Sequence, residues 1–221
     1  MPREIMIKTI LPFMNFTQLL VIFSFLVVLI TYNRHNKLHR ILLTILSVSL
    51  INEIVCLIFL YKKADISLVY TINTLFHHPL WLFLLFQTTQ RKMLGRIVLA
   101  IFFTYGVVNL ISFEGHHKFN YNTFIVGAFL YLIFFIWESF YRLKKEDFGF
   151  FLSNNYILLF APVLFFFGLS VIFGFKSREL SETVIFGDTK LYTVIGYFIN
   201  VVYYGLIILY MYREKTTKHE H

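Results

Sequence analysis

The sequence predicts an all-α polytopic membrane protein, a bundle of seven transmembrane helices forming one domain over residues 1–221. Three observations lead to this prediction. Of 221 residues, 58% are hydrophobic and 14% are charged, whereas a soluble domain has about 25% charged residues. Seven apolar runs each approach or exceed the roughly 20 residues that a helix needs to cross a bilayer. Tyrosine and tryptophan gather near the ends of these runs, where amphipathic rings lie at the lipid head groups.

The apolar runs are separated by short polar connectors, none long enough to fold as a domain. Lys8 precedes the first run, as in a signal peptide. That run is too long for a signal sequence and no A-x-A-like site follows it, so it is interpreted as a retained helix. The predicted helices lie near residues 10–32, 41–61, 68–87, 94–113, 121–141, 155–175 and 191–212.

Lys and Arg are divided unevenly between the two sides of the predicted bundle. Twelve of the 20 lie in the first, third and fifth connectors and the C-terminal segment, and eight lie on the other side. Cytoplasmic loops carry an excess of Lys and Arg. The first side is therefore expected in the cytoplasm, with the N-terminus outside and the C-terminus inside.

Four strongly polar residues fall within the predicted helices at one depth. At a rise of about 1.5 Å per residue, Gln18, Glu53, His77 and Asn200 lie roughly 12–13 Å below the outer boundary. If they face one another, they form a small polar cavity open to the outside that binds a ligand or a proton. Further polar residues in the predicted helices are Asn52, Asn73, Asn109 and His78.

Two interpretations of this polar layer remain open. Polar side chains in membranes often act as interhelical hydrogen-bonding groups, each worth less than about 1 kcal/mol on average. A carboxylate and a histidine at matched depth cost more than that role requires, which favours a ligand, proton or ion site. Glu138, by contrast, lies one turn before Arg142, and an i,i+4 ion pair accounts for it.

No motif predicts a metal, a cofactor or a catalytic centre. His77 and His78 are neighbours on a predicted helix and point about 100° apart, so they do not chelate together easily. The pair His116-His117 lies in a connector and could bind a metal at the surface, but no second cluster at ligand spacing supports such a site. The single cysteine, Cys56, excludes an intrachain disulfide and a Cys-rich metal site. The sequence has no HExxH, GxSxG, P-loop or Rossmann pattern. The net charge of +8 lies in clusters between apolar runs, which indicates contact with anionic lipids and not nucleic acid.

Three stretches resemble a group of small, uncharacterised seven-helix inner-membrane proteins of bacteria. They are INEIVCLIFLY in the second predicted helix, TINTLFHHPLWLFLLF in the third and YFINVVYYGLIILYMYREK in the seventh. The resemblance covers most of the chain as a Phe-, Ile- and Tyr-rich texture. It implies the seven-helix fold and a location in the bacterial cytoplasmic membrane.

Three classes of function fit these features. The first is a non-enzymatic membrane component that senses a small ligand, a lipid or a proton through the polar layer. With no output domain expected in the chain, it would act through a partner protein on the cytoplasmic side. The second is a transporter or channel subunit that uses the layer as a substrate site. The third is an intramembrane lipid-modifying enzyme with Glu53 and His77 as an acid and base pair.

Overall fold

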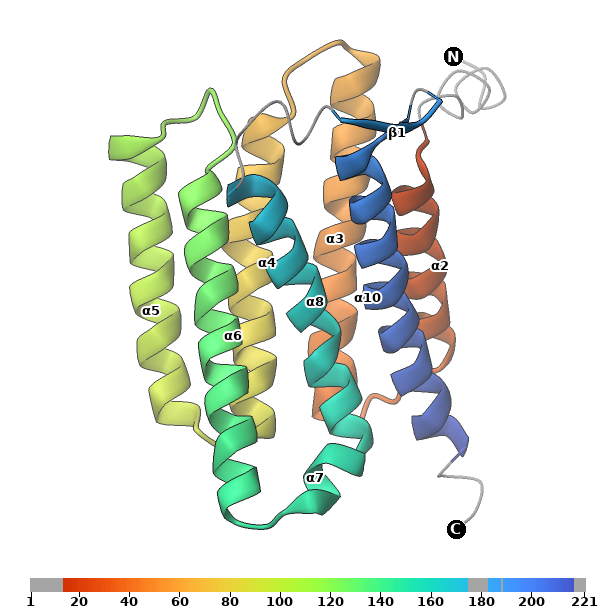
Figure 1. The fold of residues 1–221 in the computed structure, drawn as a ribbon, viewed down its shortest axis with the longest axis vertical. Coiled ribbons are helices and arrows are strands. Elements are labelled where there is room, and N and C mark those ends of the chain that lie inside the picture. Colours follow the sequence, from red (N-terminus) through yellow and green to blue (C-terminus); the bar gives the residue numbers. More distant parts are fainter. Residues whose placement is uncertain (1–13, 175–182, 188, 217–221) are drawn as a thin grey trace.

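A computed structural model describes residues 14–174, 183–187 and 189–216 as a bundle of helices standing side by side (Figure 1). Within these residues, six helices are long and apolar enough to cross a membrane. Helix α2, at 15 residues, is apolar but shorter. The helices are α2 (Phe16–Ile30), α3 (Lys37–Tyr61), α4 (Ser67–Thr88), α5 (Lys92–Val108) with its π-helical continuation η2 (Asn109–Phe113), α6 (Tyr121–Lys144), α8 (Asn154–Gly174) and α10 (Leu191–Thr216).

The expected all-helical architecture with long apolar helices is confirmed. The seventh span stays a prediction, because the first predicted run overlaps the shorter α2 and its residues 10–13 lie outside the described part of the chain. Two connectors contain short elements that the sequence did not predict. These are helix α7 (Phe148–Leu152) and an antiparallel pair of strands, β1 (Val184–Phe186) and β2 (Thr189–Lys190).

Helix ends are fixed by local hydrogen bonds. The Asn15 side chain accepts from the Gln18 N–H, and the Gln18 side chain accepts from the Asn15 N–H, so the two form a capping box at the start of α2. Helices α3, α4 and α6 are each followed by a residue with positive φ: Lys63, Gln90 and Glu146. This left-handed conformation turns the chain sharply after a helix, which accounts for the short connectors.

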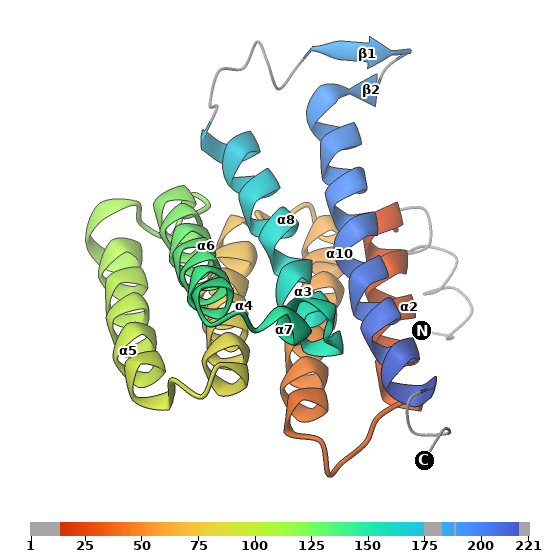
Figure 2. The ribbon, with the colours of Figure 1, turned by 60° about the horizontal axis from the view of Figure 1, so that its bottom comes forward.

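Helix α4 lies at the centre of one half of the bundle, where it packs against α3, α5 and α6. In the other half α10 packs against α2 and α8, and α8 also contacts α6 (Figure 2). The layer where the halves meet contains the fully buried side chains of Trp81, Tyr131, Phe166 and Tyr203. Large aromatic residues therefore fill the middle of the bundle.

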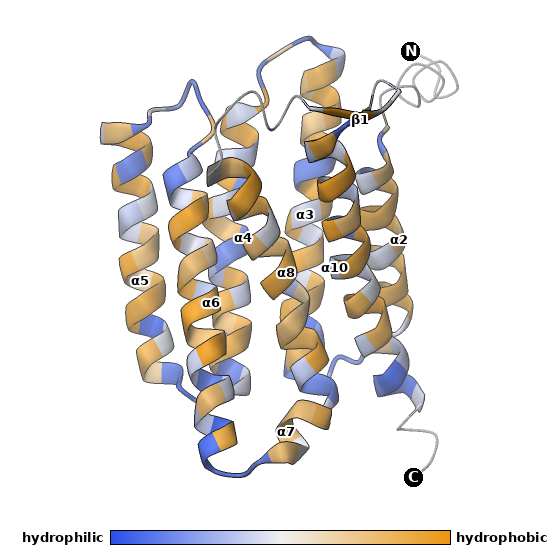
Figure 3. Ribbon diagram, viewed as in Figure 1, coloured by the Kyte–Doolittle hydropathy of each residue, from blue (hydrophilic) through white to orange (hydrophobic). Residues whose placement is uncertain are grey.

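Hydrophobic residues occupy most of each helix, and hydrophilic residues are most frequent at the helix ends and in the connectors (Figure 3). Ile101, Phe140 and Phe198 are each more than 60% exposed. Burying such side chains in lipid removes the cost of apolar contact with water, so this surface fits a bilayer. Below, the upper end means the end where α4, α6 and α10 begin, and the lower end the opposite one (Figure 1).

Candidate functional site

A cavity of about 400 Å³ lies inside the upper half of the bundle. It extends from Asn15, at the start of α2, to His77 and His78, midway along α4. Helices α3, α4 and α10 supply most of its polar wall, while α6, α8 and Phe119 supply an aromatic wall. Its volume falls within the range of about 300–1,000 Å³ that is typical of small-molecule sites.

Glu53 is the only acidic residue among the described residues that line this cavity. Its carboxylate accepts from Asn52 Nδ2 at 3.4 Å, and the Gln18 side chain lies close enough to interact with it. Gln18 is 1% exposed, and its side-chain oxygen is held by the Asn15 N–H at 2.9 Å. Gln18 therefore caps α2 and places its amide group near the acid on α3.

His77 lines the cavity at its lower end and is held by aromatic partners. Its Nε2 lies 3.3 Å from both the Tyr203 hydroxyl and the Trp81 Nε1. The Trp81 N–H also donates to the Tyr203 hydroxyl at 2.9 Å. Because an indole nitrogen can only donate, Nε2 of His77 is assigned as an acceptor, which makes the imidazole neutral. His77 and Glu53 thus share the cavity but have different hydrogen-bond partners.

Three amide side chains complete the polar wall. Asn200 donates from Nδ2 to the Gly196 carbonyl at 2.8 Å, within α10. Within the described part of the chain, the side-chain oxygens of Asn52 and Asn73 are buried and have no hydrogen-bond partner. Such acceptors are costly unless something in the cavity donates to them. They point to a ligand or to ordered water as the missing donor.

The aromatic wall is built from rings that contact one another. Phe173 packs against Phe119 and Phe124 with ring centroids 5.4 and 5.0 Å apart. On the polar side, Tyr70 and Tyr204 also line the cavity, and both lie near enough to Glu53 to interact with its charge. The cavity therefore has an acid flanked by tyrosines on one side and an apolar face on the other.

The structure brings three of the four predicted residues, Glu53, His77 and Asn200, to one cavity and places the fourth, Gln18, near the acid. Their binding of a ligand or proton stays a prediction. The sequence analysis missed Tyr70 and Tyr204. Tyr70 lies seven residues before His77, about two turns along the same face of α4, so helical spacing from the histidine is a signal that could have found it.

Asn109, the other polar residue noted in the predicted helices, lies outside the cavity. Its Nδ2 donates to Glu114 at 2.6 Å and to the Thr123 hydroxyl at 2.8 Å. It therefore joins η2 to α6. Here the interpretation as an interhelical hydrogen-bonding group holds.

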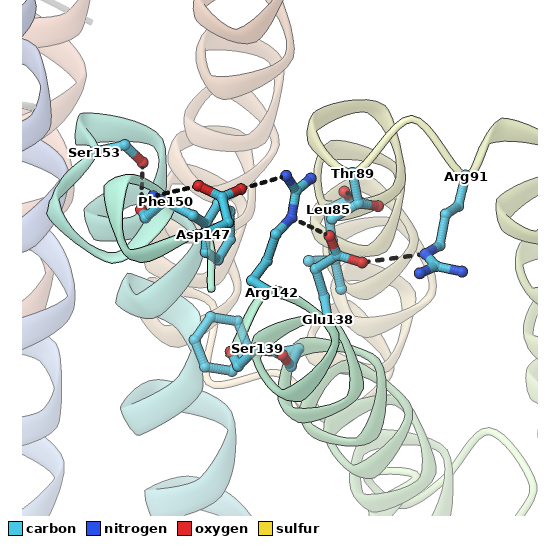
Figure 4. A network of polar contacts seen from close by, with 10 residues as sticks. Leu85, Thr89, Arg91, Glu138, Ser139, Arg142, Asp147, Phe150 and Ser153 are labelled. Atoms are coloured by element: carbon cyan, nitrogen blue, oxygen red, sulfur yellow. Dashed lines mark hydrogen bonds and ion pairs between the residues drawn. The ribbon is translucent and has the colours of Figure 1, made fainter. Parts of the chain in front are cut away.

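A second polar cluster lies at the lower end (Figure 4). The predicted pair is confirmed, since Arg142 Nε lies 2.7 Å from Glu138 Oε1. Arg91 Nε binds the other carboxylate oxygen of Glu138 at 3.1 Å, and Arg142 also binds Asp147 at 2.8 Å. The Arg91 guanidinium stacks over Trp137 at 4.4 Å. This saturated network ties the α4–α5 connector to α6 and α7, which is a structural role.

Among the described residues, no group of three His, Cys, Asp or Glu side chains is placed to hold a metal ion. His116 and His117 have ring centroids 3.9 Å apart in the connector before α6. Cys56 is buried in α3. The chemistry of the cavity is thus that of one carboxylate, amides, neutral imidazole and aromatic rings.

Comparison with protein-family models, curated proteins and solved structures found no match. The class must therefore be drawn from the fold and the cavity. Six long apolar helices with an apolar exterior indicate a multi-pass membrane protein. Its distinguishing feature is a half-polar, half-aromatic cavity reaching from the upper end to mid-depth.

Proposed function

We propose that this protein is a non-enzymatic sensor of a bacterial cytoplasmic membrane, with seven transmembrane helices including α2. It binds a small ligand or a proton in the cavity and passes the change to a partner protein at the lower end. The observation that carries this proposal is the convergence of Glu53, His77 and Asn200 on one cavity that also holds two amide oxygens lacking donors.

Helix α10 is the element suited to pass on the change. Asn200 and Tyr204 line the cavity from its middle. Two turns below, Asn154 donates to the Tyr210 carbonyl at 3.1 Å and to Glu214 at 2.8 Å. A small shift of α10 at the cavity would therefore disturb contacts at the lower end, where connectors rich in Lys and Arg gather.

The packing beneath the cavity supports a sensor over a transporter, because bulky side chains fill the bundle between the cavity and the lower end. Trp81, Tyr203 and Phe166 are fully buried against His77, and the fully buried Tyr131 packs on Phe166. Tyr131 also donates to the Leu159 carbonyl at 2.8 Å, which joins α6 to α8. Proteoliposomes with a pH-sensitive dye inside should show no protein-dependent proton flux when the outside is acidified. A flux abolished by Glu53→Gln would replace the sensor by a proton transporter.

The orientation and accessibility of the cavity can be tested with single cysteines. Cys56→Ser provides a background without other cysteines. In it, Ser49→Cys places a near-isosteric thiol on the cavity wall, and Ser24→Cys places one in packed core away from the cavity. A membrane-impermeant maleimide applied outside intact cells should label Ser49→Cys and spare Ser24→Cys. Equal protection of both would reject an outward-facing cavity.

The predicted topology is tested by the same reagent at the connectors. Lys63→Cys, after α3, should be labelled from outside, and Lys145→Cys, after α6, only after the cells are opened. The reverse pattern would invert the orientation that the distribution of Lys and Arg predicts.

A further inference from the structure

The cavity wall is rich in hydrogen-bond acceptors and poor in positive charge. Glu53 contributes a carboxylate, and Asn52 and Asn73 each contribute an amide oxygen without a donor. Asn52 is 6% exposed, and its Nδ2 faces Glu53, so its free oxygen is directed elsewhere along the wall. No Lys or Arg occurs among the described residues that line the cavity. An anion would therefore meet an acid and find no compensating cation.

The apolar part of the cavity limits the shape of its ligand. Phe119, Phe124 and Phe173 form one continuous aromatic face. Tyr70 and Tyr204 lie near the acid, and aromatic faces attract organic cations. A bare metal ion would leave this face uncovered, whereas a cation with an apolar body would cover it.

We propose that the cavity binds a protonated primary amine carried on a compact apolar body. The ammonium group lies against Glu53 and donates N–H bonds to the free oxygens of Asn52 and Asn73. The apolar body packs on the phenylalanine face. This inference names the ligand class of the site described above and so rests on the proposed function.

A primary ammonium suits the wall better than a quaternary one. It has three N–H donors, and the cavity presents three acceptor groups: the Glu53 carboxylate and the two amide oxygens that lack donors. Charge-assisted hydrogen bonds are about twice as strong as neutral ones. A quaternary ammonium keeps the charge but has no donor, so it leaves the oxygens of Asn52 and Asn73 unpaired, which weakens its binding.

The primary ammonium has two possible sources: a free aromatic or aliphatic amine, and the head group of phosphatidylethanolamine, whose ammonium would enter the cavity while its phosphate stays at the opening. The experiment with a free amine, the free arm, measures binding of radiolabelled 2-phenylethylamine to the protein in phosphatidylcholine nanodiscs. The lipid arm compares maleimide labelling of Ser49→Cys, in the Cys56→Ser background, in nanodiscs of phosphatidylethanolamine and of phosphatidylcholine. Protection by phosphatidylethanolamine alone assigns the lipid source.

In the free arm, binding should be saturable and about tenfold or more weaker in Glu53→Gln. Glu214→Gln is the matched control, because Glu214 lies at the lower end and its replacement keeps an acceptor for Asn154. Trimethyl(2-phenylethyl)ammonium should compete about tenfold less well than the primary amine. 3-Phenylpropionate, similar in shape but an anion, should not compete.

The inference is overturned if 3-phenylpropionate or neutral 2-phenylethanol competes as well as the amine, or if Glu53→Gln binds as tightly as the wild type. It is also overturned if neither arm shows binding or protection. Labelling of Ser49→Cys separates this failure from that of the proposed function. A Ser49→Cys that is accessible in phosphatidylcholine nanodiscs without amine binding rejects only the ligand class, while one that is inaccessible there rejects the open cavity itself.

Discussion

The Trp81 indole N–H donates a hydrogen bond to the Tyr203 hydroxyl over 2.9 Å, joining α4 to α10 immediately below the cavity. Both side chains are fully buried. The Tyr203 hydroxyl in turn lies 3.3 Å from Nε2 of His77. The three polar groups therefore satisfy one another where a free donor or acceptor would be costly.

Tyr203→Phe should lower the free energy of unfolding by about 1 kcal/mol. This loss of stability is small for a buried hydrogen bond, because the indole can still donate to His77 at 3.3 Å. Thermal unfolding of the purified protein in one detergent measures the effect. Tyr212→Phe, at an exposed position, is the control and should not change stability. A Tyr203→Phe variant as stable as the wild type would show that the hydrogen bonds of the Tyr203 hydroxyl contribute nothing to stability.

The close approach of α6 to α4 depends on Gly127. A β-carbon added there would lie 2.5 Å from His78 Cδ2 and 2.9 Å from Phe102. Gly127→Ala should therefore destabilise the protein by about 1–3 kcal/mol, since fully buried rings must move. Gly205→Ala, where no such atom lies within 4 Å, should be neutral or stabilising by up to about 1 kcal/mol. Equal effects of the two substitutions in the same unfolding assay would contradict this account.

Glu138 neutralises two guanidinium groups at the lower end. Its side chain is 4% exposed, and those of Arg91 and Arg142 are 28% and 27% exposed. Glu138→Gln should cost about 2–3 kcal/mol, because an amide offers one acceptor oxygen to two cations and leaves charge uncompensated. Glu146→Gln, exposed in the next connector, should leave the unfolding midpoint unchanged. Similar midpoints for both variants would mean that the network is not stabilising.

Asp65 makes the stability of the start of α4 depend on pH. Its carboxylate accepts from the Ser67 N–H at 2.9 Å and from the Ser67 hydroxyl at 2.8 Å. These hydrogen bonds, the backbone one foremost, lower the pKa of Asp65 from its ordinary value of 3.8. A lowered folded-state pKa means that the stabilisation is complete above about pH 4 and lost as the pH falls below it.

The wild type should therefore exceed Asp65→Asn in stability at pH 7, and the difference should shrink at pH 3. Asn keeps an uncharged acceptor in the same place, so this difference isolates the charge of Asp65. Thermal unfolding at the two pH values provides the comparison. A difference that is the same at pH 3 and pH 7 would assign the effect to side-chain shape.

The amino-acid sequence by itself determined the long apolar helices and the depth of the polar residues. Length and hydropathy suffice for this, because a helix of known rise must span a layer of fixed thickness. Thus the sequence predicted a helix at residues 68–87, and α4 extends over Ser67–Thr88. The matched depth of Glu53 and His77 followed from counting residues along each helix. The Glu138–Arg142 pair followed from helical spacing in the same way.

Only the tertiary structure decided which polar residues face one another. Depth does not fix rotation about the helix axis, so Asn109 and Asn73 were equivalent in the sequence. In the bundle Asn109 bonds to Thr123, while Asn73 lines the cavity. The partners of Glu138 and Glu53 also come from other helices: Arg91 lies 47 residues from Glu138, and Gln18 lies on α2. Such contacts arise from the packing of whole helices, which local sequence patterns do not encode.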